Sequence, residues 1–165
     1  MAKKLQVYVE SSFVCYLTGD ETLDEKVAAN QAYTRRWWAE EKASCDVFVS
    51  RFVVAECDIG RKDAVARRDA ILKQLPILDI DESKVAALAQ SLIEGHALPQ
   101  GETTDALHIA SAALAKMDVL LTWNCRHMAN PHTLPKTIEI IENAGCRCPW
   151  IMTPKTFLDN QNMEV

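Results

Sequence analysis

The stretch DALHIASAALAKMDVLLT, residues 105–122, decides which kind of fold this chain adopts. Residues 105–116 are predicted to form a helix, capped at its start by the hydroxyl of Thr103 or Thr104. The helix consists largely of Ala, Leu and Ile, so it should be packed on nearly all sides and lie centrally. Residues 119–122 follow with the uniform apolar character of a buried strand. A buried helix followed by a buried strand is typical of a parallel sheet covered by helices.

Outward from this stretch, helix-like and strand-like segments alternate along the chain. The clearest helical pattern places apolar residues at i, i+3, i+4, i+7 and i+8, namely Val85, Leu88, Ala89, Leu92 and Ile93. We expect further helices over residues 23–43, 50–60 and 63–75, and further strands over 5–10, 46–50, 76–80 and 149–153. Strands separated by helices predict an α/β fold with a mostly parallel central sheet, covered by helices on both faces.

Length and composition favour one folded domain. The chain has 165 residues, and we expect a single domain over residues 1–158 with a frayed C-terminal tail over 159–165. No apolar run approaches the roughly 18 residues of a membrane span, and the N-terminal residues do not resemble a signal peptide. We therefore expect a cytoplasmic protein whose six cysteines are reduced.

The charge balance disfavours one class of protein. The net charge is −5 and the pI is about 5.4, whereas proteins that hold nucleic acid through many phosphate contacts are usually basic. A stable DNA-binding module is therefore disfavoured. An enzyme that handles a polyanion transiently remains compatible with this balance, because an acidic site that holds cations lowers the pI.

Polar side chains stand where the predicted strands end. Glu10 ends the first strand, Asn124 follows the strand at 119–122, and Asp105 lies in the first turn of the apolar helix. Ligands of open parallel sheets bind beyond the C-terminal ends of the strands. Glu56 lies on the apolar stripe of its helix, where a buried carboxylate needs a partner. These four residues are the candidate site.

Four segments in order carry a family resemblance: VYVESS at 7–12, VVAE at 53–56, DALHIASA at 105–112 and LLTWN at 120–124. Together they resemble a PIN domain of the VapC-like, toxin-type ribonuclease family, over about residues 5–153. The resemblance implies a three-layer α/β/α sandwich with a mostly parallel central sheet. It also implies an endoribonuclease that uses Mg²⁺ or Mn²⁺ to cleave RNA into products with a 5′-phosphate and a 3′-hydroxyl. The partners that it implies are the RNA substrate, an antitoxin protein and a second copy of the chain.

The resemblance also implies roles for individual residues. Glu10, Glu56 and Asp105 match the family's acids and would be the metal ligands. Ser12 matches the Ser or Thr just after the first acid, and Asn124 occupies the fourth polar position; both would position water or the ligands. These five residues are the predicted catalytic set.

Two positions depart from the family pattern, and a third differs from many toxins. Glu10 stands where the family usually has Asp, which lengthens the side chain by one methylene. Asn124 stands where relatives often have Asp, which removes one charge. His127 lies where many toxins carry a further Asp.

The physical chemistry of the three acids agrees with a cation site. Carboxylates about 4 Å apart repel one another by roughly 4 kcal/mol per pair at an effective dielectric near 20. Protons or a divalent cation must neutralise such a cluster, and oxygen ligands favour Mg²⁺ or Mn²⁺ over zinc.

Structural interpretations compete with each functional one. Glu10 could cap the following helix, Glu56 could form an ion pair with Arg51 or Arg61, and Asp105 suits a helix N-terminus by its charge alone. His108, one turn beyond Asp105, is interpreted as a hydrogen-bonded histidine of the core. Trp123 is interpreted as a packing residue. Arg51 and Arg126 follow strand ends and are candidates to contact RNA.

Two other functions remain open at this point. The first is a catalytically degenerate PIN-like domain that serves as a protein or RNA interaction module, which the departures at Glu10 and Asn124 favour. The second is a zinc-stabilised module built from the C-terminal quarter of the chain. Its candidate ligands would be Cys125, His127, His132, Cys146 and Cys148.

Overall fold

The computed structural model describes residues 2–161 and has four parallel strands in its central sheet. They are β1 (Leu5–Val9), β2 (Cys45–Phe48), β3 (Val119–Leu121) and β4 (Trp150–Met152), in the order β2-β1-β3-β4. Every neighbouring pair is parallel. The predicted α/β class and parallel sheet are therefore confirmed.

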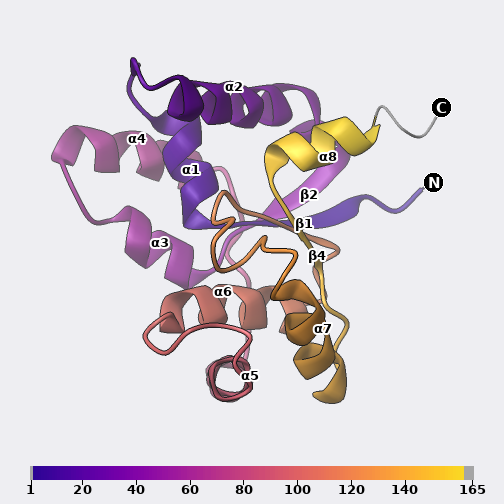
Figure 1. Cartoon of the computed structure of the whole chain (residues 1–165). Coiled ribbons are helices and arrows are strands. Elements are labelled where there is room, and N and C mark those ends of the chain that lie inside the picture. The colour runs from indigo at the N-terminus through magenta and orange to yellow at the C-terminus, as the bar shows by residue number, and fades with distance from the viewer. Residues whose placement is uncertain (1, 162–165) are drawn as a thin grey trace.

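Helices cover both faces of this sheet, as Figure 1 shows. On one side lie α1 (Ser11–Thr18), α2 (Glu25–Glu40) and α8 (Pro154–Gln161), and on the other lie α5 (Glu82–Glu94), α6 (Thr103–Leu114) and α7 (Leu134–Asn143). Two further helices, α3 (Arg51–Cys57) and α4 (Lys62–Leu72), follow β2, and a short 3₁₀ turn, η1 (Lys42–Ser44), precedes it. The molecule is thus the three-layer α/β/α sandwich that was expected.

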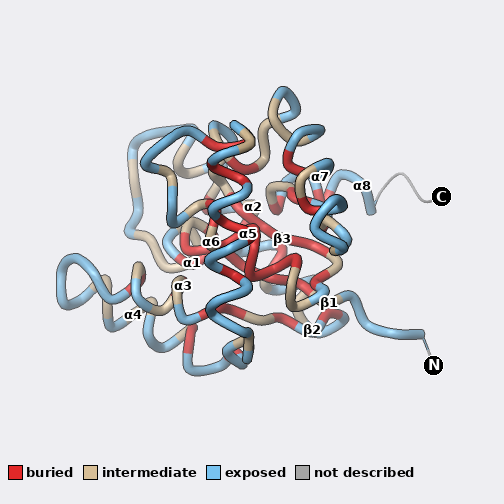
Figure 2. The backbone as a smooth tube through the Cα atoms, turned by 90° about the horizontal axis from the view of Figure 1, so that it is seen from below, coloured by how far each residue is buried: buried red, intermediate tan, exposed pale blue. Residues whose placement is uncertain are grey.

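Buried residues gather in the middle of the molecule, on the strands and on the helices packed against them (Figure 2). All five apolar residues of the predicted pattern in α5 are buried. In α6, Ala106, Ile109, Ala110 and Ala112 have no exposed surface, which confirms the prediction of a central, closely packed helix. Small alanine side chains allow α6 to pack closely on α5.

Three local predictions are wrong. Residues 76–80 form no strand of the sheet but a single parallel bridge, Val49 to Ile77, because Pro76 has no N–H to donate and Ile77 stays 56% exposed. Neither Thr103 nor Thr104 caps α6, which begins at Thr103 after Glu102, with no side-chain cap. Residues 159–161 belong to α8 rather than to a frayed tail, and the rest of that predicted tail lies outside the described residues.

Other helices differ from their predicted bounds or were not predicted. The helix expected over 23–43 is α2, which begins after Asp24 because that carboxylate caps the backbone N–H groups of Lys26 and Val27. The helices α7 and α8 were not predicted from the periodicity. Within residues 2–161, no helix has both the length and the apolar character that a membrane crossing requires.

Candidate metal centre

The parallel strands bring three polar residues to one edge of the sheet. Glu10 follows β1, Ser50 lies just beyond β2, and Thr122 follows β3. The Glu10 backbone N–H donates to the Leu121 carbonyl at 3.0 Å, which extends the pairing of β1 and β3 to the start of the site. The candidate centre therefore lies at the C-terminal edge of the sheet, as the strand order predicts.

Glu10 is held by two hydroxyl groups. The residue is only 6% exposed, and its Oε2 accepts hydrogen bonds from Ser12 Oγ at 2.5 Å and Thr122 Oγ1 at 2.7 Å. Those two hydroxyl oxygens accept in turn from the backbone N–H groups of Trp123 (2.8 Å) and Asn124 (3.0 Å). Glu10 occupies the N-cap position of α1 without capping it, so the capping interpretation is wrong.

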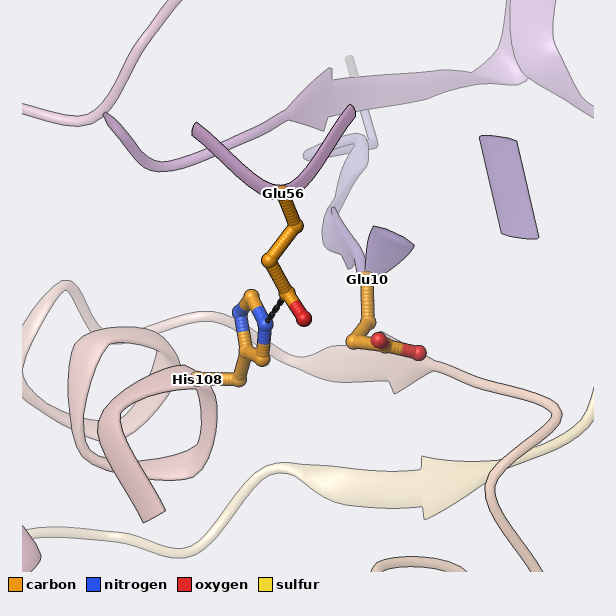
Figure 3. Close-up of side chains that lie close together, drawn as sticks. All are labelled: Glu10, Glu56 and His108. Atoms are coloured by element: carbon orange, nitrogen blue, oxygen red, sulfur yellow. Dashed lines mark hydrogen bonds and ion pairs between the residues drawn. The ribbon is translucent and has the colours of Figure 1, made fainter. Parts of the chain in front are cut away.

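Glu56 projects from α3 toward Glu10 and His108 (Figure 3). Its Oε1 accepts hydrogen bonds from Ser11 Oγ at 2.5 Å and from His108 Nε2. Burial raises the pKa of Glu56, but the hydrogen bonds from His108 and Ser11 outweigh it, so the pKa of this carboxyl lies below its ordinary value. The ionised carboxylate is therefore the favoured form.

The predicted arginine partners of Glu56 are engaged elsewhere. Arg51 pairs with Glu82, and Arg61 pairs with Asp20 at 2.8 Å on the surface. The ion-pair interpretation of Glu56 is therefore wrong, and its partner is a histidine instead.

His108 joins the two glutamates. One ligand atom from each of Glu10, Glu56 and His108 lies within 4.8 Å of the others. The His108 ring has no exposed surface, and its Nδ1 lies 2.6 Å from the Tyr8 hydroxyl. The interpretation of His108 as a hydrogen-bonded core histidine is confirmed, and the structure adds that one of its hydrogen bonds is to Glu56.

Asp105 belongs to a second group beside the first. It lies with Glu102 and His127, one ligand atom of each within 4.8 Å of the others. Asn124 Nδ2 donates to Asp105 Oδ2 at 2.9 Å, while His127 Nδ1 lies 3.4 Å from the same oxygen. Burial raises the pKa of Asp105 above its ordinary value, and the negative charges of Glu102 and Glu10 add to the effect of burial.

The predicted triad is therefore divided. Glu10 and Glu56 converge with His108, whereas Asp105 converges with Glu102 and His127. Asn124 lies between the two groups, because its Nδ2 donates to Asp105 Oδ2. A backbone link also joins them, because the Asn124 N–H donates to the Thr122 hydroxyl that holds Glu10.

Each of the three predicted ligands keeps one carboxylate oxygen free of protein hydrogen bonds. Within residues 2–161, protein donors contact only Oε2 of Glu10, Oε1 of Glu56 and Oδ2 of Asp105. Among the same residues, Trp37 Nε1 alone is a fully buried side-chain nitrogen or oxygen without a partner, so none of the free carboxylate oxygens is fully enclosed. Both ring nitrogens of His108 are engaged. The arrangement thus offers oxygen donors, which suits Mg²⁺ or Mn²⁺.

The zinc interpretation finds no support in the described part of the chain. Neither group of metal-capable side chains found in residues 2–161 contains a cysteine. His127, one of the proposed zinc ligands, instead contacts Asp105 and Glu102. All six cysteines are free thiols.

Sequence reasoning missed several residues of this centre. Ser11 and Thr122 donate to Glu56 and Glu10, and Tyr8 contacts His108. Their signal in the sequence is position alone, since each lies within two residues of a strand's C-terminal end. Trp123 was correctly interpreted as packing: its ring N–H donates to Thr34 Oγ1 at 2.8 Å.

Comparison with models of known protein families and with curated proteins gives no match to this sequence.

Proposed function

We propose that this protein is a metal-dependent endoribonuclease of the PIN type, which uses Mg²⁺ or Mn²⁺ to hydrolyse RNA phosphodiester bonds. The observation that carries the proposal is how the carboxylate oxygens of the three acids are hydrogen-bonded. Glu10, Glu56 and Asp105 each use one oxygen to fix the side chain and leave the other free of protein hydrogen bonds. Carboxylates prepared in this way are suited to a divalent cation.

Two of the acids would bind the ion, and neighbouring hydroxyl groups would hold those acids in place. Glu10 would hold the ion through Oε1, while Ser12 and Thr122 hold its Oε2. Glu56 would hold it through Oε2, while Ser11 holds its Oε1. When bound, the ion would supply Lewis-acid polarisation of the phosphodiester and make the attacking water more acidic.

Asp105 and Asn124 would act at the second group. Burial and neighbouring acids raise the pKa of Asp105, which suits this carboxylate to accept a proton from water. Asn124 orients it through the hydrogen bond to Oδ2, and its own Oδ1 accepts from the His127 backbone N–H at 3.0 Å.

Arg126 is the arginine best placed to receive the RNA backbone. Arg51, the other arginine predicted to contact RNA, is paired with Glu82. Arg126 lies two residues beyond Asn124 and is exposed, and no carboxylate of residues 2–161 forms an ion pair with it. A guanidinium at this place can hold a phosphate beside the acids.

The deciding experiment is calorimetric titration with Mn²⁺, paired with an RNA cleavage assay, on the parent protein and Glu10→Gln. The substitution removes one charge but keeps an oxygen that can accept from Ser12 and Thr122, so the fold should survive. We expect saturable Mn²⁺ binding and cleavage in the parent, and loss of both in Glu10→Gln. Glu94→Gln, at an exposed acid on α5, is the matched control and should behave like the parent.

One observation favours the second candidate, a PIN-like interaction module without catalysis. Asp105 lies with Glu102 and His127 rather than with Glu10 and Glu56. If the parent protein shows no Mn²⁺ binding, the nuclease proposal fails and the interaction module becomes the better account.

A further inference from the structure

A chain of buried polar side chains runs from the end of β2 to the candidate metal centre. Ser50, Tyr8 and His108 have no exposed surface. The Ser50 and Tyr8 hydroxyl oxygens lie 2.7 Å apart, the Tyr8 hydroxyl lies 2.6 Å from His108 Nδ1, and His108 Nε2 contacts Glu56 Oε1. The members come from β1, α6 and the two ends of α3, so the chain forms only in the folded protein.

The donor and acceptor of each hydrogen bond in the chain follow from Glu56, the residue at its end. An ionised carboxylate only accepts, so His108 Nε2 must carry the hydrogen that points at Glu56. In a neutral imidazole the other nitrogen then accepts, and Tyr8 is the donor that faces it. The Tyr8 hydroxyl has one hydrogen, which points at His108, so the Ser50 hydroxyl donates to the Tyr8 oxygen.

This arrangement restricts a side chain that would otherwise be mobile. Glu56 lies on a seven-residue helix, and its side chain is 39% exposed. The ring that holds it is immobile, because His108 is fully buried and packs edge-to-face on Tyr8 with ring centres 5.9 Å apart. With Oε1 fixed by His108 and Ser11, Oε2 remains free of protein hydrogen bonds.

We infer that His108 is a positioning residue of the candidate metal centre: it holds Glu56 through Nε2–H, and Tyr8 and Ser50 hold His108 in the tautomer that this requires. The inference rests on the proposed function, since it assigns His108 a part in preparing Glu56 for a divalent cation. It also excludes His108 as a ligand, because both of its ring nitrogens are used.

Two substitutions of His108 separate positioning from simple packing. The amide nitrogen of Gln can take the place of Nε2 and still donate to Glu56, whereas the shorter Asn reaches only the place of Nδ1, beside Tyr8. We expect His108→Asn to weaken Mn²⁺ binding in calorimetry about 10- to 100-fold, the usual effect of losing a partner of a metal ligand. His108→Gln should restore most of that affinity.

Each result bears on the inference. If His108→Asn binds Mn²⁺ as tightly as the parent, or if His108→Gln is as weak as His108→Asn, the positioning role is wrong while the proposed metal centre stands. If the parent itself binds no Mn²⁺, the proposed function fails first.

A measurement on the metal-free protein tests the tautomer independently. Nitrogen-15 NMR of the imidazole rings, with the His108 signal assigned by its absence in His108→Gln, reports which nitrogen carries hydrogen. We expect Nε2 of His108 to be protonated and Nδ1 to be unprotonated in the parent. An unprotonated Nε2 in the parent overturns the inference.

Discussion

At the scale of single residues, the pKa values of Glu56 and Asp105 are shifted in opposite directions. The hydrogen bonds from His108 and Ser11 outweigh burial at Glu56 and lower its pKa. Burial dominates at Asp105, where a single amide donor does not compensate for two neighbouring acids, and the pKa rises. The fold therefore favours an ionised Glu56 and opposes an ionised Asp105.

Asp105→Asn should stabilise the metal-free protein at neutral pH. A raised folded-state pKa means that the ionised carboxylate destabilises the fold at every pH above that pKa. The gain in melting temperature should be largest near pH 7 and should disappear as the pH falls through the folded-state pKa of Asp105 toward its ordinary value. Thermal unfolding of parent and variant across this range measures it. A constant difference at all pH values would contradict the assignment.

Glu56→Gln should have the opposite effect. A lowered folded-state pKa contributes stability that is present above the ordinary glutamate pKa and is lost as the pH falls through the folded-state value. Replacing charge-assisted hydrogen bonds by neutral ones should cost about 1 kcal/mol at neutral pH. Urea unfolding at pH 7 and at acidic pH measures this cost, which should shrink in acid. A Glu56→Gln protein more stable than the parent at pH 7 would show that repulsion from Glu10 outweighs the bond to His108.

At the scale of elements, the C-terminal end of α6 contains a strained residue. Lys116 has a φ of +59°, in the left-handed region. Its N–H donates to the Ala113 carbonyl and the Met117 N–H donates to the Ala112 carbonyl, the hydrogen bonds that end a helix in this conformation. Glycine adopts this conformation without a Cβ clash.

Lys116→Gly should therefore be more stable than Lys116→Ala, by about 1 kcal/mol. Both variants lose the same charged side chain, so their difference isolates the backbone strain. Chemical unfolding of the two proteins, compared at the same ionic strength, measures it. Equal stabilities would mean that the helix end relaxes to another conformation.

The helices differ in how clearly their sequences predict them. The α5 pattern of apolar residues matches the helical period, and each of those positions is buried. In α7, by contrast, β-branched Thr137, Ile138, Ile140 and Ile141 have weak helix propensity, and the helix is stabilised by burial of Thr137 and Ile141.

At the scale of the whole molecule, the helical layer of α5 and α6 covers one face of the sheet. It also carries Asp105 and His108, which both lie on α6. Leu92 of α5 has no exposed surface, and α5 packs extensively on α6. Leu92→Ala should destabilise the protein by about 2–5 kcal/mol through loss of buried surface and a residual cavity. Urea unfolding checks this, with exposed Lys84→Ala on the same helix as the control. A loss below that range would mean that the layer closes around the cavity.

The sequence by itself determined the α/β class, the parallel sheet and the edge at which acids gather. Hydrophobic period and strand ends are local properties, and the rule that parallel strands end together converts them into a site. Only the tertiary structure decided which acids meet. Glu56 and His108 are 52 positions apart, and Glu10 and Thr122 are 112 apart. Contacts over such separations depend on how α3 and α6 pack in the folded protein. A different rotation of either helix about its axis would bring a different side chain to the site.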